Sequence, residues 1–143
     1  MSDEWQRIGF TCGAFDLMHA GHMLMFEDAK SVCDKLIVAI QSDPSIDRPY
    51  KNRPVQSFDE RVIMVSGCRY VDEVLLYHTE DDLLKILKQV NPDVRILGSD
   101  YLNKTFTGQD LPIEIYYHKR EHDWSSSELR ERVYYRERVE NEG

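Results

Sequence analysis

The sequence predicts an α/β protein in which helices cover both faces of a mostly parallel sheet of five strands. Short β-branched or apolar runs alternate with segments of helical periodicity, which is typical of strands joined by helical crossovers. The run at residues 36–40 is apolar throughout, as in a strand covered on both faces. The length suits a single three-layer domain over residues 1–143, with a core at about residues 7–133.

The first half of the chain alternates regularly between the two kinds of element. A strand is expected over residues 7–13, where a short run ends at a glycine. A helix follows over residues 21–33, because its apolar residues recur at helical spacing. The next strand covers residues 35–40, and a further helix is expected over residues 58–70.

The second half continues the alternation. Thr79 is a typical N-cap for a helix whose apolar stripe runs from Leu83 to Val90, and Asn91-Pro92 ends it. The remaining expected elements are strands at residues 72–77, 93–98 and 112–118, and a charged C-terminal helix and tail at residues 125–143.

The longest irregular stretch lies between residues 42 and 57 and contains three prolines. Long loops in compact domains are often functional. Open parallel sheets bind their ligands beyond the carboxyl ends of the strands. We therefore expect the functional residues directly after the strands.

Composition and charge exclude several classes of protein. The 18 basic and 26 acidic residues give a formal net charge of −8, so bulk nucleic acid and anionic membranes should repel the chain. Its longest clean apolar run is far shorter than the roughly 20 residues of a membrane span. No signal peptide is visible, and three widely spaced cysteines fit reduced thiols. We expect a cytoplasmic protein without membrane insertion or a nucleic-acid partner.

The strongest local signal is the segment TCGAFDLMHAGH, where the first strand gives way to a helix. His19 and His22 are three residues apart at the helix start, so their rings face the same way. Backbone N–H groups and the positive end of the helix dipole lie beside them, which suits a phosphate or a developing phosphoryl charge. Gly13 would let a nucleotide approach the backbone closely.

Two other interpretations of the histidine pair remain open. A zinc ion could take both imidazoles with Asp16 as a third ligand, although no cysteine lies nearby and a helix N-terminus disfavours a cation. Alternatively, the histidines and Asp16 are ordinary turn residues. We assign no protein side chain as a metal ligand.

The residues around the pair narrow this choice. The segment from Cys12 to His22 resembles the GTFDxxHxGH signature of the cytidylyltransferase-like nucleotidyltransferases, most of all the glycerol-3-phosphate, phosphocholine and phosphoethanolamine cytidylyltransferases. Ala14 stands where the family usually has threonine, so that hydroxyl is missing here. The resemblance extends from about residue 8 to residue 133 and implies a Rossmann-like fold.

Four further segments carry the resemblance. Residues 39–43 look like the family's AxSxD stretch, and residues 58–61 like its helix with an arginine. Residues 68–74 match its RYVDEV stretch, and residues 98–101 look like the GxD-aromatic segment that lines the cytosine pocket.

The family's RTxGISTT motif is less regular in this chain. Arg120 aligns with its arginine and residues 125–127 with STT, but Glu121, Asp123 and Trp124 replace Thr, Gly and Ile. Ser125 with the glutamate three residues later is also the spacing of a helix capping box.

The resemblance implies a role for each matching residue. The catalytic residues would be His19, His22, Lys51 and Arg120. The nucleotide-binding residues would be Cys12, Gly13, Ala14, Phe15, Asp16, Gly21, Gly98, Asp100, Tyr101, Trp124, Ser125 and Ser126. The residues at the acceptor or at a subunit contact would be Asp43, Arg61, Arg69 and Asp72. Arg61 and Arg69 share one expected helix and would converge on an anionic substrate.

The function that the resemblance implies is transfer of CMP from CTP to the phosphate of a small phosphorylated alcohol, such as glycerol 3-phosphate, with release of pyrophosphate. Mg²⁺ is expected with the triphosphate, and the resemblance implies a homodimer. An adenylyltransferase that uses ATP remains open, because residues 124–127 also resemble the pantetheine-phosphate adenylyltransferases. A nucleotide-binding module without turnover remains open as well.

Overall fold

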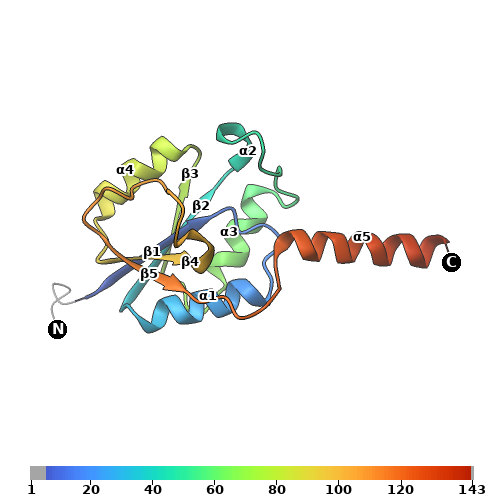
Figure 1. Ribbon diagram of the computed structural model, residues 1–143, viewed down its shortest axis with the longest axis horizontal. Helices are drawn as coiled ribbons and strands as arrows, with labels where there is room; N and C mark the ends of the chain where they lie inside the picture. Colours follow the sequence, from blue (N-terminus) through green and yellow to red (C-terminus); the bar gives the residue numbers. More distant parts are fainter. Residues whose placement is uncertain (1–5, 143) are drawn as a thin grey trace.

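The computed structural model describes residues 6–142 as one sheet with helices on both faces and a last helix that projects from the body (Figure 1). The strands are β1 (Ile8–Gly13), β2 (Lys35–Gln41), β3 (Glu73–Tyr77), β4 (Val94–Gly98) and β5 (Glu114–His118). The helices are α1 (Ala20–Ser31), α2 (Pro44–Asp47), α3 (Phe58–Ser66), α4 (Glu80–Val90), η2 (Ser99–Tyr101) and α5 (Ser126–Glu142).

The strand order is β3-β2-β1-β4-β5, and every pairing is parallel. The expected α/β class is therefore confirmed, and the sheet is fully parallel. β1 lies at the centre, with β2 on one side and β4 on the other, so the chain changes direction across the sheet between them. A crevice beyond the carboxyl ends of β1 and β4 is where such a sheet binds ligands.

Two hydrophobic clusters hold the layers together, one on each face of the sheet. Alternate residues of a strand point to opposite faces, so Val38 packs with α1 and α3 while Ile37 packs with α4. Phe26 of α1 and Leu87 of α4 are fully buried in the two clusters. This two-sided burial explains why β2 is apolar throughout.

The main difference from the expected boundaries concerns α3. The helix ends at Ser66, with Gly67 as its C-cap, instead of continuing to residue 70. Arg69 consequently lies outside the helix that carries Arg61, and the expectation that the two arginines share a helix face is wrong. The expected irregular stretch also contains α2, whose N-cap Asp43 accepts hydrogen bonds from the backbone and hydroxyl of Ser45.

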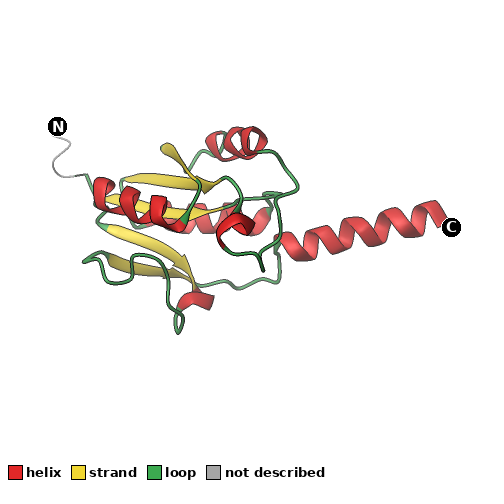
Figure 2. Cartoon of the chain, turned by 90° about the horizontal axis from the view of Figure 1, so that it is seen from above, coloured by secondary structure: helices red, strands yellow, loops and turns green. Residues whose placement is uncertain are grey.

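Helix α5 extends away from the sheet, as Figure 2 shows from above. Its first turn lies near the sheet, while later side chains such as Val133 and Tyr134 are exposed. Among residues 6–142, no helix is both long enough and apolar enough to cross a membrane.

Candidate active site

A cavity of about 770 Å³ opens at the carboxyl ends of β1, β4 and β5. This volume falls in the range of natural ligand sites. The residues on its wall that the sequence predicted are Cys12, Gly13, His19, Gly21, His22, Gly98, Asp100, Tyr101, Arg120, Trp124, Ser125 and Ser126. The structure thus gathers most of the predicted site residues around one space.

The histidine pair lies where β1 leads into α1. The two rings are neighbours, with centroids 4.0 Å apart. The Nδ1 atom of His19 accepts a hydrogen bond from the backbone N–H of Gly21 at 3.0 Å, and Nδ1 of His22 accepts from the N–H of His19 at 3.1 Å. Because each Nδ1 is an acceptor, the ring proton of each neutral histidine is on Nε2, which leaves an N–H donor for a ligand.

The surroundings of both histidines lower the pKa and so favour the neutral imidazole. Burial, together with the neighbouring His19, lowers the pKa of His22 to about 3. Burial, followed by the charges of His122 and Arg120, lowers the pKa of His19. An anion between them would oppose these shifts, because a negative charge favours the protonated imidazole.

One part of the sequence prediction requires correction. Backbone N–H groups at the start of α1 were expected to hold a phosphate, but the amides of His19 and Gly21 are bonded to the imidazoles. The amide of His22 is bonded to the carbonyl of His19. The histidine side chains therefore cap the helix by accepting hydrogen bonds from its first amides. The donors left for a ligand are then the Nε2–H groups of the two rings.

Another part of the cavity wall comes from the segment before α5, whose His122 lies beside Gly21 and His19. The Arg120 guanidinium donates to the carbonyls of His122 and Trp124, at 3.2 and 2.6 Å, and so folds this segment. The rings of His122 and Trp124 stack at 4.9 Å. The Ser125 hydroxyl accepts from the amide of Glu128, so the expected cap of α5 is present.

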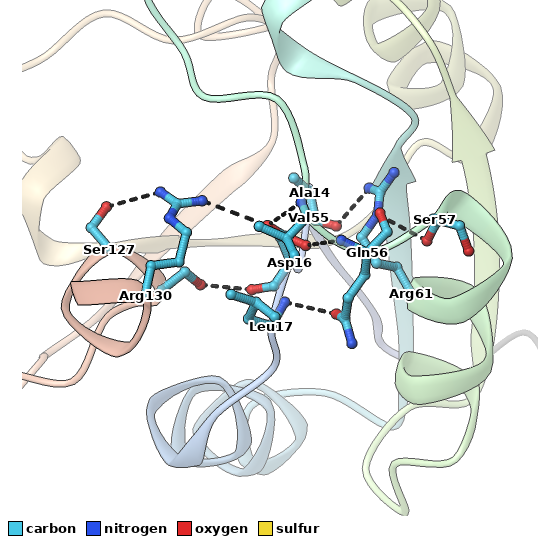
Figure 3. A network of polar contacts seen from close by, with 10 residues as sticks. Ala14, Asp16, Leu17, Val55, Gln56, Ser57, Arg61, Ser127 and Arg130 are labelled. Atoms are coloured by element: carbon cyan, nitrogen blue, oxygen red, sulfur yellow. Dashed lines mark hydrogen bonds and ion pairs between the residues drawn. The ribbon is translucent and has the colours of Figure 1, made fainter. Parts of the chain in front are cut away.

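Asp16 has a different role from the one expected of it. Its two carboxylate oxygens accept hydrogen bonds from the backbone amides of Val55 and Gln56, both at 2.9 Å (Figure 3). Arg130 of α5 lies 3.6 Å from the same carboxylate, and the Ser126 hydroxyl donates to the Asp16 carbonyl. Asp16 therefore fixes the loop after β1 to the chain before α3 and to α5, and it is not on the cavity wall.

Arg61 is also turned away from the cavity. Its side chain is fully buried and donates to five backbone carbonyls, those of Ala14, Gln41, Ser42, Gln56 and Ser57. This buried guanidinium is committed to carbonyls at the ends of β1 and β2 and before α3, and it is not on the cavity wall. The structure therefore gives Arg61 a role in holding these segments together and gives no support to its predicted role at the acceptor.

The loop between β1 and α1 is held in a strained conformation. Phe15 and Leu17 both have positive φ angles, of 52° and 51°, which are rare for residues with a side chain. The Phe15 ring packs in the core against Phe26 and makes a T-shaped contact with the His22 ring. Phe15 thus supports the histidine from behind and does not line the cavity.

The other predicted residues lie outside the cavity wall. Lys51 is exposed beside the ring of Tyr50, which does line the cavity. Asp72 binds Lys30 and the amide of Leu36 at the amino end of β2, on the far edge of the sheet. Arg69 lies at the same far edge, against Tyr70. Neither Asp72 nor Arg69 lines the cavity, and their predicted role at the acceptor or at a subunit contact stays a prediction.

Several residues on the cavity wall were missed by sequence reasoning. They are Arg48, Tyr50, Tyr77, Glu80, Arg95, Phe106, Thr107, His118 and His122. The signal for one of them was present: Arg95 interrupts an apolar strand, and a buried charge in a strand requires a partner.

Four of these wall residues carry a buried polar atom without a hydrogen-bond partner among the described residues. These atoms are Nε of Arg48, Oε2 of Glu80, Nε of Arg95 and Nε2 of His118. The His118 Nδ1 atom bonds to Asp28 at 2.7 Å, so its ring is fixed. Unpaired buried polar atoms are uncommon in proteins, and around a cavity they indicate places for a ligand.

Among residues 6–142, no three histidine, cysteine, aspartate or glutamate side chains come together as a metal site. The zinc interpretation also loses its third ligand, because the Asp16 carboxylate is bonded to backbone amides.

Comparison with known proteins finds relatives across most of the chain. A family model described as cytidylyltransferase-like matches residues 10–132. The bifunctional protein HldE of Paramagnetospirillum magneticum is 40% identical over 114 residues, which are 76% of this chain and 23% of that protein. HldE of Helicobacter pylori (strain HPAG1) is 36% identical over 129 residues, 90% of this chain and 28% of that protein. The chain thus spans about a quarter of the length of these curated relatives.

Solved structures share the fold. The lipopolysaccharide core biosynthesis protein from Thermoplasma volcanium superposes with a TM-score of 0.69 at 24% identity, over 82% of this chain and 99% of that one. Pantoate-beta-alanine ligase from Francisella tularensis superposes with a TM-score of 0.62 at 19% identity, over 89% of this chain and 66% of that one. At these identities the similarity shows the fold alone.

Proposed function

The chain belongs to the cytidylyltransferase-like family, and on this premise we propose that it transfers a nucleotidyl group from a nucleoside triphosphate to the phosphate of a small acceptor. The observation that carries the proposal is the geometry of the histidine pair. His19 and His22 lie side by side on the wall of a large cavity, each with its Nδ1 engaged and its Nε2–H available. Two adjacent donors of this kind suit the oxygens of a polyphosphate.

The reaction is a displacement at the α-phosphorus of the triphosphate. An oxygen of the acceptor phosphate forms the new P–O bond, and the bond to pyrophosphate breaks with its electron pair on the leaving oxygen. The attacking oxygen is already anionic, so the step needs no strong general base. The difficulty is electrostatic, because two anions must meet, and catalysis consists mainly of positioning and charge stabilisation.

The neutral state of the histidines fits this task. A neutral imidazole donates one hydrogen bond without carrying a charge into a buried site, and it gains proton affinity as negative charge develops on the leaving group. Arg120 and the Ser125–Ser126 start of α5 line the same cavity as the pair. We propose that they bind the distal phosphates. Lys51, on the rim beside Tyr50, stays a proposed ligand of the triphosphate.

Mg²⁺ would enter with the nucleotide. The phosphate oxygens are the hard ligands that this ion prefers, and it commonly binds through substrate phosphates together with few protein groups. The ion would neutralise charge on the polyphosphate. In the described part of the chain, no cluster of side chains substitutes for those phosphate ligands.

We propose CTP as the nucleotide, in line with the matched family. The stretch from Cys68 to Val74, which resembles the family's RYVDEV segment, lies outside the wall of this cavity. ATP is the second candidate, since Trp124 to Ser126 line the cavity and its volume accommodates a purine. A homodimer and a cytoplasmic location are also part of the proposal.

A pyrophosphate-release assay tests this function. The full chain is given CTP, ATP, GTP or UTP with Mg²⁺, each crossed with a panel of phosphorylated alcohols and sugars. We expect release that requires both an acceptor and one preferred nucleotide. If calorimetry shows that a nucleotide binds but no pyrophosphate is released, the result would instead support a nucleotide-binding module without turnover. Release with ATP but not with CTP would show that the nucleotide is ATP, and it would still support the proposed nucleotidyl transfer.

A further inference from the structure

A third imidazole lies on the cavity wall beside the histidine pair. His122 belongs to the segment before α5 and occupies the unspecified position of the RTxGISTT motif, so the resemblance gives it no role. A Cβ atom added to Gly21 would lie 2.6 Å from Cε1 of His122 and 2.8 Å from Cε1 of His19. Two imidazoles from distant parts of the chain therefore flank the backbone of Gly21, in the first turn of α1.

The orientation of the His122 ring is fixed by the residue two positions later. The Nδ1 atom of His122 accepts a hydrogen bond from the backbone N–H of Trp124 at 3.0 Å, and the two rings stack with centroids 4.9 Å apart. The Arg120 guanidinium donates to the His122 carbonyl at 3.2 Å, which holds the backbone at this point. A neutral imidazole whose Nδ1 is an acceptor carries its proton on Nε2. His122 therefore has one N–H donor left for a ligand.

The three imidazoles share one arrangement. In His19, His22 and His122 alike, Nδ1 accepts a hydrogen bond from a nearby backbone amide, and the ring proton is on Nε2. All three side chains line the same cavity. Burial first, and then the charge of a protonated His122, lower the pKa of His19, so these two rings interact electrostatically. Each of the three rings can offer a phosphate oxygen one donor whose direction is set before the ligand binds.

His122 also joins the two segments to which the proposed function assigns the phosphates. Through Gly21 it lies against the start of α1, which carries the histidine pair. Along the chain it lies between Arg120 and Ser125, which line the cavity and are proposed to bind the distal phosphates. A triphosphate that extends from the pair toward these two residues would pass His122 at its middle phosphate.

We infer that His122 is a third catalytic imidazole, whose Nε2–H donates to the middle phosphate of the bound triphosphate. The inference rests on the proposed function and adds a residue to its site. When the bond between the α-phosphorus and the leaving oxygen breaks, the electron pair stays on pyrophosphate, and a donor on the middle phosphate stabilises that charge. A hydrogen bond that strengthens as charge develops raises kcat in addition to its contribution to binding.

A purely structural role for His122 makes a different prediction. In that case the side chain serves only to accept from the Trp124 amide and to stack on its ring. Asparagine can place its oxygen near the position of Nδ1 and keep that hydrogen bond, but it has no donor near Nε2. Glutamine can place its amide N–H near Nε2, but it has no acceptor near Nδ1. The two substitutions therefore separate the donor role from the structural one.

Pyrophosphate release by the full chain, with its preferred nucleotide and acceptor, compares the two variants. We expect kcat to fall at least about tenfold in His122→Asn and by less than about threefold in His122→Gln, because only the second keeps a donor for the phosphate. His78→Asn, at an exposed histidine outside the cavity wall, is the matched control and should leave kcat unchanged. A wild-type kcat in His122→Asn, or a kcat in His122→Gln that is no higher than in His122→Asn, would overturn the inference and keep the proposed function.

Calorimetry makes the test independent of turnover. The probes are the non-hydrolysable analogue of the nucleoside triphosphate that binds most tightly, with Mg²⁺, and the matching nucleoside monophosphate. The Kd of the triphosphate should rise at least about fivefold in His122→Asn, as expected for one lost hydrogen bond to a charged group, while the Kd of the monophosphate stays unchanged. This pattern without any pyrophosphate release by the wild type would remove the proposed function and keep His122 as a phosphate ligand. An equal rise in both Kd values would place His122 at the base or the sugar and overturn the inference.

Discussion

Two groups of charged residues surround the end of β1, and they differ in how fully their polar atoms are used. The anchor network, made of Asp16, Arg61 and Arg130, holds the loop after β1 to α3 and α5 through backbone contacts (Figure 3). On the cavity wall, by contrast, Arg48 and Glu80 each keep one buried atom without a hydrogen bond. The comparison indicates that charged groups whose polar atoms are bonded maintain the shape of the site, whereas those with an unbonded atom at the cavity can still bind a ligand.

The difference also explains why resemblance to a family motif does not settle a residue's role. Asp16 and Arg61 belong to matched segments, yet neither faces the cavity. They hold a loop in which Phe15 and Leu17 have positive φ angles, a conformation that persists only when its surroundings impose it. The positions of the two histidines thus depend on Asp16 and Arg61, which hold the loop in place without facing the cavity.

Replacing Arg61 should show the largest effect on stability. Arg61→Met keeps much of the side chain's volume but leaves five backbone carbonyls without their donor. We expect the free energy of unfolding to fall by at least about 3 kcal/mol, as measured by urea unfolding. Arg69→Met, at an exposed position, should cost less than about 0.5 kcal/mol. Equal losses in the two variants would contradict the structural role of Arg61.

Replacing a histidine should have the opposite effect, with a large loss of activity and a small loss of stability. In His22→Asn the amide oxygen can still accept from the backbone near the position of Nδ1, while the Nε2–H donor to the ligand is lost. We expect kcat to fall by about 10²–10³-fold, the cost of one donor to a developing anion, with a small change in unfolding temperature. A variant that unfolds normally and turns over at the wild-type rate would remove His22 from the catalytic residues.

The pH dependence of the free energy of unfolding tests the buried histidine His22 separately from the anchor network. The pKa of His22 is about 3 in the folded chain, against an ordinary value near 6.5, so below pH 6.5 the unfolded chain binds a proton that the folded chain does not. Stability should therefore fall as the pH is lowered from about 6.5 toward 3, by at most about 1.4 kcal/mol per pH unit for this group.

Urea unfolding of the wild type and His22→Asn at pH 7.5, 6.0 and 5.0 measures this contribution. The variant should lose less stability on acidification than the wild type, because its residue 22 does not titrate. Parallel curves for the two proteins would mean that His22 accepts a proton as readily in the folded chain as in the unfolded one.

The smallest expected effect concerns Lys51 on the rim of the cavity. One solvent-screened charge contributes on the order of 1 kcal/mol, so Lys51→Ala should raise the nucleotide KM about fivefold. Lys88→Ala, on α4 away from the cavity wall, should leave the KM unchanged. A nucleotide KM that is the same in both variants would remove Lys51 from the site.

Local patterns predicted the elements well. The β-branched run of β2, the Thr79 cap of α4 and the spacing of the histidines each depend on residues close in sequence, and the structure contains them. The boundary of α3 was misplaced because Gly67 stops the helix earlier than its apolar pattern indicates. The error mattered, since it placed Arg69 on the same helix face as Arg61.

The sequence by itself determined the parallel α/β fold, the family and the pair of histidines at the start of α1, because these follow from periodicity, caps and one contiguous motif. Only the tertiary structure decided which charges face the cavity. Arg61 and Arg95 are both buried arginines, and their difference lies in partners: carbonyls brought together by three separate segments surround Arg61, whereas Arg95 contacts one carbonyl, the Cys12 sulfur and one ring beside the cavity. Such partners come from distant parts of the chain, so no local pattern records them.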